Sequence, residues 1–154
     1  MIRTAIATFA SLAFVAASVA QTPPKPAPFT YLPAAEQQKL VANPDPKGGA
    51  KSSMLDRRES FSAQIVSRAA DGTVEAHAHW IDYITILEGE VTLTVGGTIS
   101  GNTVDDLGES HGGAQAGGTA LPLRAGDYIQ IQAGVPHRMT APKGLRYMAM
   151  KVRN

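Results

Sequence analysis

The chain has 154 residues, a formal net charge of +1 and no cysteine. The balanced charge argues against nucleic acid and anionic membrane surfaces as partners, and a small or weakly charged ligand fits better. The absence of cysteine excludes disulfides and a cysteine-linked lipid anchor, and the length suits one domain with its own core.

Residues 1–20 are predicted to be a signal peptide. Arg3 gives a positive start, residues 4–19 carry no charge, and Ser18, Val19 and Ala20 offer small residues for cleavage after Ala20. The apolar run is shorter than the roughly 20 residues of a stable membrane helix, although an uncleaved anchor is the alternative. Removing 20 of 154 residues leaves 134, with 13 basic side chains, one fewer than the 14 of the whole chain, against 13 acidic ones. We therefore expect a periplasmic or secreted protein that is free of the membrane after cleavage.

Residues 21–45 are predicted to form a proline-rich linker followed by a short helix. The linker, QTPPKPAP, favours an extended tether because prolines cannot donate backbone hydrogen bonds. Pro33 then opens PAAEQQKLVAN, which is rich in good helix formers, and Asn43-Pro44 ends it.

Residues 46–154 are predicted to be a single β domain. Apolar and polar residues alternate in several runs, and Gly or Asp occupies nearly every gap between them, which is typical of an antiparallel sandwich or barrel. The glycine-rich segment 97–118 interrupts this rhythm and is expected to be a functional or disordered loop. The predicted strands lie at about 61–69, 73–79, 82–88, 90–96, 119–123, 127–132, 135–140 and 145–152.

Histidines are the strongest candidates for a functional site, because they can bind a metal ion. His77 and His79 are two residues apart in a strand-like run, so a period of two would place both imidazoles on one face. Imidazole nitrogens bind zinc, iron, copper and nickel. His137 follows a predicted turn, and Asp82 is the nearest downstream carboxylate. Two surface histidines without a metal are the alternative explanation of the pair.

Two longer segments extend this pattern. They read GTVEAHAHWIDYITILEGE from Gly72 to Glu90 and GDYIQIQAGVPH from Gly126 to His137. Both resemble motifs of the cupin superfamily. The first motif is a glycine, a spacer, HxH, three or four residues, a glutamate, and a glycine seven residues later; the second is a glycine, a strand and PxGxxH. The resemblance implies an all-β fold, an antiparallel barrel of the double-stranded β-helix or jelly-roll type, with a short N-terminal helix.

The same resemblance implies a divalent metal ion, Zn, Fe, Mn or Ni, held by His77, His79, Asp82 and His137. One departure concerns the glutamate position, which holds Asp82 at a spacing from His79 shorter than the family's. Glu75, on the same predicted strand face as His77, or a water molecule are the alternatives for that ligand.

Several other polar residues receive no motif-based role. Tyr83, Glu75 and His111 are equal candidates for proton transfer. A lid residue that closes over the metal is a further alternative for His111. The default for the polar side chains of the glycine-rich loop is exposure to solvent, and this covers Asp105, Asp106, Glu109 and His111.

The sequence thus predicts an exported, metal-dependent enzyme acting on a small organic molecule, with isomerase, oxygenase and lyase chemistry equally open. The alternatives are a non-catalytic protein that binds or senses a small ligand and a purely structural metal site. We also expect a homodimer, both from the resemblance and because exposed strand edges need covering.

Overall fold

The computed structural model describes residues 30–41, 49–141 and 143–154. The predicted signal peptide and the proline-rich stretch to Pro28 lie outside these residues. Leu32–Asn154 forms one compact unit, and the described part of the chain contains no helix with the length and apolarity needed to span a membrane. The helix α1 (Ala34–Lys39) lies where a helix was predicted, but it is shorter than expected because Leu40 already has extended backbone angles.

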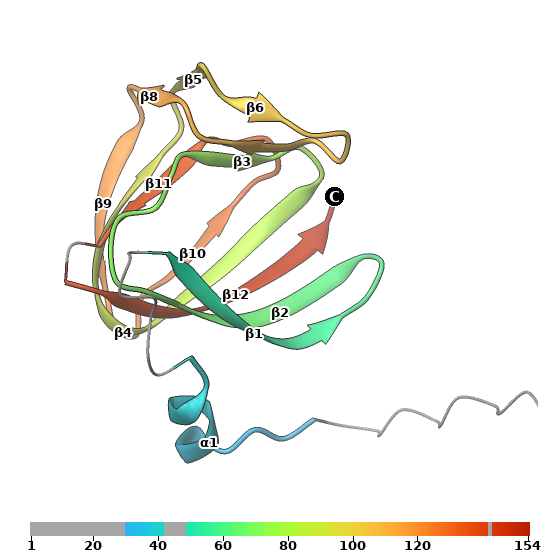
Figure 1. The fold of residues 1–154 in the computed structure, drawn as a ribbon, viewed down its shortest axis with the longest axis vertical. Coiled ribbons are helices and arrows are strands. Elements are labelled where there is room, and N and C mark those ends of the chain that lie inside the picture. Colours follow the sequence, from blue (N-terminus) through green and yellow to red (C-terminus); the bar gives the residue numbers. More distant parts are fainter. Residues whose placement is uncertain (1–29, 42–48, 142) are drawn as a thin grey trace, which may run out of the picture. The chain divides into compact units, whose positions relative to one another are not determined.

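The rest of the described chain is a curled antiparallel β structure, as predicted (Figure 1). One sheet has the order β1-β2-β12-β4-β10, and the other has the order β9-β4-β11-β3-β7-β6. The strands are β1 (Ala50–Arg57), β2 (Phe61–Arg68), β3 (Glu75–His77), β4 (Trp80–Val95), β5 (Thr98–Ser100), β6 (Thr103–Val104), β7 (Glu109–His111), β8 (Ala114–Ala116), β9 (Thr119–Arg124), β10 (Tyr128–Ile131), β11 (His137–Thr140) and β12 (Leu145–Arg153).

Strand β4 belongs to both sheets, whereas the sequence predicted two separate strands at 82–88 and 90–96. Its first part pairs with β12 and β10, and its last part pairs with β9 and β11. Gly89, with φ of +85°, lies at the change-over, where a Cβ atom would come within 2.6 Å of the Gly144 carbonyl oxygen. Glycine is therefore required where the strand turns from one sheet into the other.

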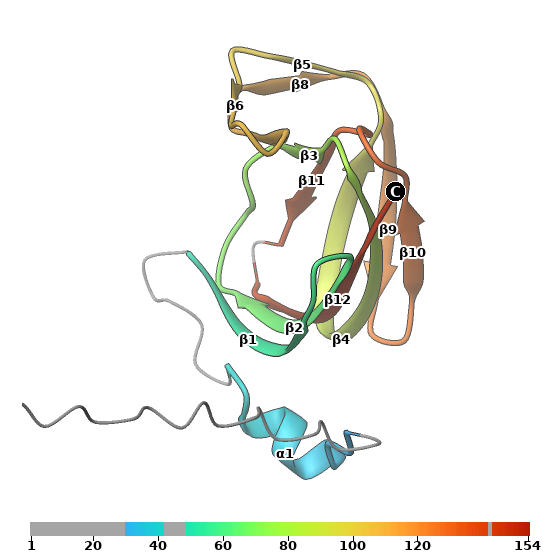
Figure 2. The ribbon, with the colours of Figure 1, turned by 90° about the vertical axis from the view of Figure 1, so that its right-hand side faces the viewer.

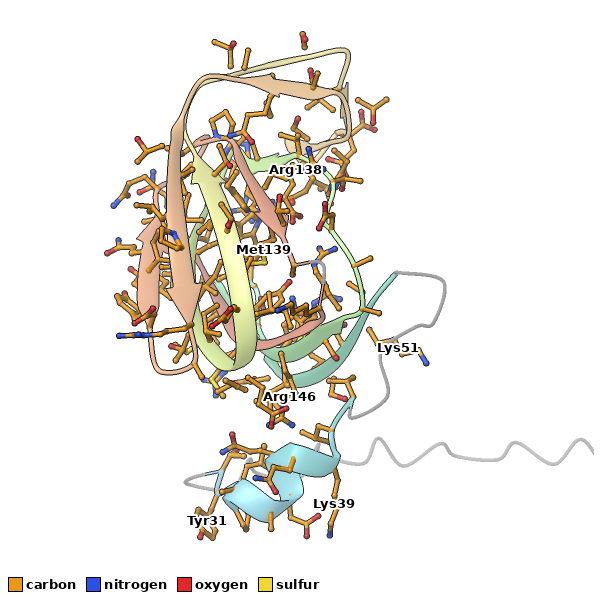
Figure 3. All side chains as sticks on the ribbon, turned by 90° about the vertical axis from the view of Figure 1, so that its left-hand side faces the viewer. Tyr31, Lys39, Lys51, Arg138, Met139 and Arg146 are labelled. Atoms are coloured by element: carbon orange, nitrogen blue, oxygen red, sulfur yellow. The ribbon has the colours of Figure 1, made fainter. Side chains whose placement is uncertain are left out.

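Side chains from both sheets fill the interior. Ile65, Ile86 and Leu93 are almost completely buried, and each contributes about 1.5–3 kcal/mol by leaving water. Along β11 the strand period places Met139 inside and Arg138 outside (Figure 3). This alternation also determines which polar residues of the strands enter the barrel.

The segment 97–118 contains ordered strands, so the expectation of a long loop was wrong. Strand β5 pairs with β8, and β6 pairs with β7, which in turn pairs with β3. The segment lies at the end of the barrel that holds β3 (Figure 2). Strand β1, which is absent from the strands predicted from the sequence, pairs with β2 and forms an edge of the sheet β1-β2-β12-β4-β10. Because β7 pairs with β3, the glycine-rich segment forms part of the wall around β3.

Candidate metal centre

Glu75, His77 and His137 come together inside the barrel. Glu75 and His77 lie at the two ends of the short strand β3, and His137, the first residue of β11, is the cross-strand partner of Glu75. One ligand atom from each residue lies within 4.8 Å of the other two, and the two imidazole centroids are 5.3 Å apart. Both histidines are buried. Residues sixty positions apart in sequence thus share one site.

Asp82 joins this group through the two imidazoles. Its Oδ2 atom lies 3.3 Å from His77 Nε2 and 3.4 Å from His137 Nε2. Its Oδ1 atom is buried and has no hydrogen-bond partner among the described residues. Buried carboxylates ordinarily pair with a charge or coordinate a metal. Two imidazoles, two carboxylates and an unpartnered carboxylate oxygen together fit a divalent ion.

His79 does not join the group, contrary to the expected shared strand face. Strand β3 ends at His77, and Ala78 and His79 form a turn in which the Ala78 N–H donates to Gly108 O. His79 is exposed, because the strand period of two does not continue through a turn. Counted from His77, four residues precede Asp82, which agrees with the spacing in the cupin motif. Glu75 and His77, two residues apart on β3, therefore line the pocket together with Asp82, whereas His79 does not.

Hydrogen bonds at Nδ1 orient both buried imidazoles. Glu109 Oε2 contacts His77 Nδ1, and His137 Nδ1 lies 3.1 Å from the carbonyl oxygen of Val135. An N–H at each Nδ1 leaves the Nε2 lone pair for a metal, and such carboxylate or carbonyl partners are usual for metal-binding histidines. The expectation that Glu109 belongs to a solvated loop was wrong, because β7 places it opposite His77.

Burial and neighbouring charges shift the pKa values of the group. Burial lowers the pKa of His77, but the hydrogen bond and negative charge of Asp82 outweigh it, so the pKa lies above its usual value. For Asp82, burial alone would raise the pKa, yet His77 and the Lys151 charge lower it overall. Burial lowers the pKa of His137. Near neutral pH, Asp82 is therefore ionised and His137 is neutral, which are the forms that bind metals.

Lys151 completes the centre and was missed in the sequence. Its Nζ atom lies 3.0 Å from His77 Nε2 and 3.9 Å from both Asp82 Oδ1 and Glu109 Oε2. Tyr147, Ala149 and Lys151 share one face of β12 by the strand period, and all three line the same pocket. In the sequence, the alternation that places Tyr147 on one strand face also predicts that Lys151 lies on that face.

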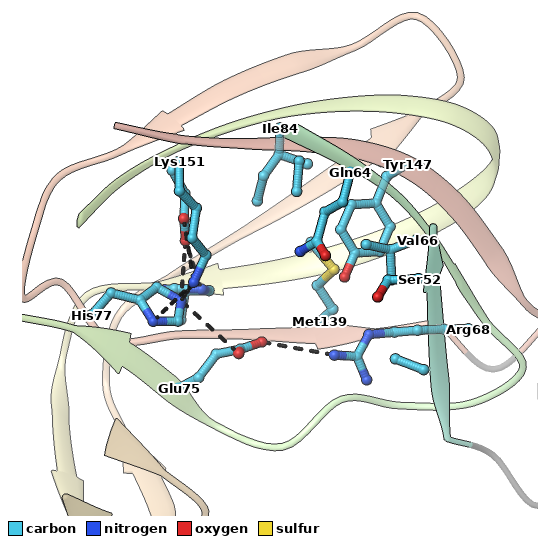
Figure 4. Close-up of a pocket in the computed structure, with 14 residues that line it drawn as sticks. Ser52, Gln64, Val66, Arg68, Glu75, His77, Ile84, Met139, Tyr147 and Lys151 are labelled. Atoms are coloured by element: carbon cyan, nitrogen blue, oxygen red, sulfur yellow. Dashed lines mark hydrogen bonds and ion pairs between the residues drawn. The ribbon is translucent and has the colours of Figure 1, made fainter. Parts of the chain in front are cut away.

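The centre lies in a pocket of about 170 Å³ (Figure 4). Among the proton-transfer candidates, Glu75 lines this pocket, His111 is exposed on β7, and Tyr83 alternates with the buried Asp82 and so points to the other face of β4. The lining residues are Ala50, Ser52, Gln64, Val66, Arg68, Glu75, His77, Asp82, Ile84, His137, Met139, Tyr147, Ala149 and Lys151.

Solved structures of cupins share this backbone arrangement. An RmlC-like cupin from Shewanella frigidimarina is 23% identical over 72% of this chain and 82% of its own, with a TM-score of 0.53. A double-stranded β-helix protein from Klebsiella pneumoniae is 16% identical over 71% and 81%, with a TM-score of 0.52. The cupin domain of Schizosaccharomyces pombe Cnp3 is 17% identical over 68% of this chain and 65% of its own, just under two thirds, with a TM-score of 0.51. No family model matches the sequence, and no curated protein matches it significantly. These similarities concern the fold.

Proposed function

Because the chain has the cupin fold, we propose that it is a metal-dependent enzyme acting on a small organic molecule held inside the barrel. The ligands of the ion are Glu75, His77, Asp82 and His137. The observation that carries this proposal is the convergence of two oriented imidazoles on carboxylate oxygens in a buried pocket. Isolated buried carboxylates and imidazoles are costly, and a divalent ion offsets the negative charge of Glu75 and Asp82.

The surrounding residues have distinct tasks in this proposal. A divalent ion would supply Lewis-acid polarisation of an oxygen of the bound molecule. Glu109 and the Val135 carbonyl keep the two imidazoles oriented. The Lys151 ammonium group, which lines the pocket of the centre and also a second pocket, would donate a proton to a molecule in the barrel.

A protein that binds or senses a small ligand without turnover would use the same metal ligands. The position of Lys151 favours the enzyme, because proton transfer beside the metal ligands is needed for turnover but not for binding alone. The Lys151→Met variant separates the two functions, since loss of the ammonium group should abolish turnover while metal binding remains. In a non-catalytic protein the parent would show no turnover of any bound molecule.

Metal titration of single variants tests the proposed ligands. We expect Glu75→Ala, His77→Ala and His137→Ala to lose more affinity than the roughly 10–100-fold typical of a lost outer partner. His111→Ala, which removes an exposed imidazole from β7, is the matched control and should bind as the parent does. His79→Ala should also keep its affinity, and a large loss there would restore His79 as a ligand. Elemental analysis that finds no metal in natively purified protein would contradict the proposal.

A further inference from the structure

The pocket has two chemically different ends. One end holds the metal-ligand group, and the other holds Arg68 at the end of β2 (Figure 4). The Glu75 carboxylate lies between them: Oε2 is 4.0 Å from His77 Nε2, and Oε1 is 3.7 Å from Arg68 Nη2. The guanidinium is thus one carboxylate group away from the proposed metal.

The hydrogen-bonding capacity of Arg68 is only partly used within the described residues: its guanidinium lies against the Tyr147 hydroxyl, where it partly opposes the burial that raises the pKa of that group. Its side chain is only 13% exposed, and its buried Nε has no hydrogen-bond partner among them. The 3.7 Å separation from Glu75 is too long for a hydrogen bond. Gly72 leaves room for the guanidinium, because a Cβ atom there would lie 3.2 Å from its central carbon. A buried guanidinium with unfilled donors is costly unless an acceptor arrives with a ligand.

Further hydrogen-bonding groups surround Arg68. Ser52, Gln64 and Tyr147 line this end of the pocket. Burial raises the pKa of Tyr147, so its hydroxyl keeps its proton and can donate a hydrogen bond. The aliphatic part of the lining comes from Val66, Ile84, Met139 and Ala149, and of these Ile84 and Met139 lie between the two ends (Figure 4). A matching ligand has an apolar middle and a hydrogen-bond acceptor at the Arg68 end.

The balance of charge identifies that acceptor as an anion. Glu75, Asp82 and Glu109 bring three negative charges, and Arg68 and Lys151 bring two positive ones. The group therefore carries −1 without metal, and a divalent ion changes this to +1 when both imidazoles are neutral. A monoanion neutralises the loaded site, and Arg68 offers the bidentate geometry that suits a carboxylate.

The size of the pocket limits the ligand. Cavities of about 150 Å³ hold one benzene ring, so a pocket of about 170 Å³ accepts a molecule of about six to eight non-hydrogen atoms. An acid of three or four carbons with one additional oxygen has about six or seven non-hydrogen atoms and falls within this range.

We propose that the barrel binds a short aliphatic hydroxy or oxo monocarboxylate, with its carboxylate on Arg68 and its other oxygen toward the metal centre. This inference rests on the proposed metal function. It assigns Arg68 to ligand recognition, whereas a guanidinium that only holds Glu75 in place would act on metal affinity alone.

The experiment uses zinc-loaded full chain and three probe acids: lactate, 3-hydroxybutyrate and 4-hydroxybutyrate. The uncharged amide of each acid is its matched control, since it has the same number of non-hydrogen atoms. Zinc affinity is measured first, and acid affinity is then measured by calorimetry. We expect the parent to prefer at least one acid over its amide, and Arg68→Gln to lose about 10- to 100-fold in affinity for that acid. The affinity of the variant for zinc should remain unchanged.

Two further variants guard against a general loss of structure. Arg124→Gln, which removes an exposed charge on β9, should bind the acid as the parent does. Arg68→Lys keeps the charge without the planar fork and should recover part of the affinity. If the zinc-loaded parent prefers none of the acids, or Arg68→Gln keeps the preference, the inference is overturned while the metal function stands. A parent that binds no zinc overturns the proposed metal function itself.

Discussion

Replacing Glu109 isolates the contribution of a residue that touches His77 but is not itself a proposed metal ligand. Its carboxylate contacts Nδ1 and is only 18% exposed, so solvent compensates little for its loss. Glu109→Gln keeps an oxygen that can accept the Nδ1–H and removes the charge, whereas Glu109→Ala removes both. Outer partners of this kind contribute about 10–100-fold in metal affinity, or about 1.4–2.7 kcal/mol. We expect the loss of metal affinity to lie near the lower limit for Glu109→Gln and near the upper limit for Glu109→Ala.

Two measurements check this expectation, namely the dissociation constant for zinc and the metal-induced rise in melting temperature. Because the ion binds only the folded chain, the stabilisation at a fixed zinc concentration should fall by the same free energy as the affinity. Asp106→Asn is the matched control, since Asp106 is an exposed carboxylate of the same segment. Glu109 variants that bind zinc as tightly as the parent, while His77→Ala does not, would refute a role for Glu109 in orienting the imidazole.

Four further results are expected. Glu75→His introduces a third imidazole and should shift the preference from manganese toward nickel and zinc, as measured by competition; an unchanged preference would place Glu75 outside the coordination group. Zinc affinity should fall as pH decreases through the raised pKa of His77, because protons displace the metal from that nitrogen, so titrations between about pH 5 and 8 should show a loss that begins above the pKa of an ordinary histidine. Intact-mass analysis of exported protein should show Gln21 as the first residue, and a mass that includes residues 1–20 would refute cleavage. Light scattering at micromolar concentration should give a dimer, and a monomer would count against the expected covering of strand edges.

The sequence predicted the architecture well because the relevant signals are local. Alternation of apolar residues marked most strands, and the spacing from Asp82 to Gly89 identified the carboxylate that lies against both imidazoles. The meeting of His77 and His137 also followed from the motifs. Strand β1 was not predicted because it follows residues that are typical of turns and because five of its eight residues are exposed.

The remaining site residues depend on pairings between distant segments, which no local spacing encodes. Glu109 reaches His77 only because β7, inside a glycine-rich segment, pairs with β3. Lys151 enters through the face that β12 presents once it pairs with β4. The composition of β7 and that of β12 do not indicate that either strand contributes a residue to the site.

His79 shows that a strand period can stop within a motif. Strand β3, which carries the proposed ligands Glu75 and His77, ends at His77, where the His77 carbonyl accepts a hydrogen bond from Gly134 N–H and the Ala78 N–H donates to the Gly108 carbonyl. These two contacts, rather than the identity of residue 79, decide which side chains face the interior. In the proposed ligand set, Glu75 takes the place predicted from the sequence for the imidazole of His79, which has a chemical consequence. A carboxylate has two oxygens and can face His77 with one and Arg68 with the other, whereas a neutral imidazole could offer Arg68 no negative charge. Glu75 therefore adds a negative charge to the proposed metal site and connects that site to the guanidinium proposed to bind the ligand.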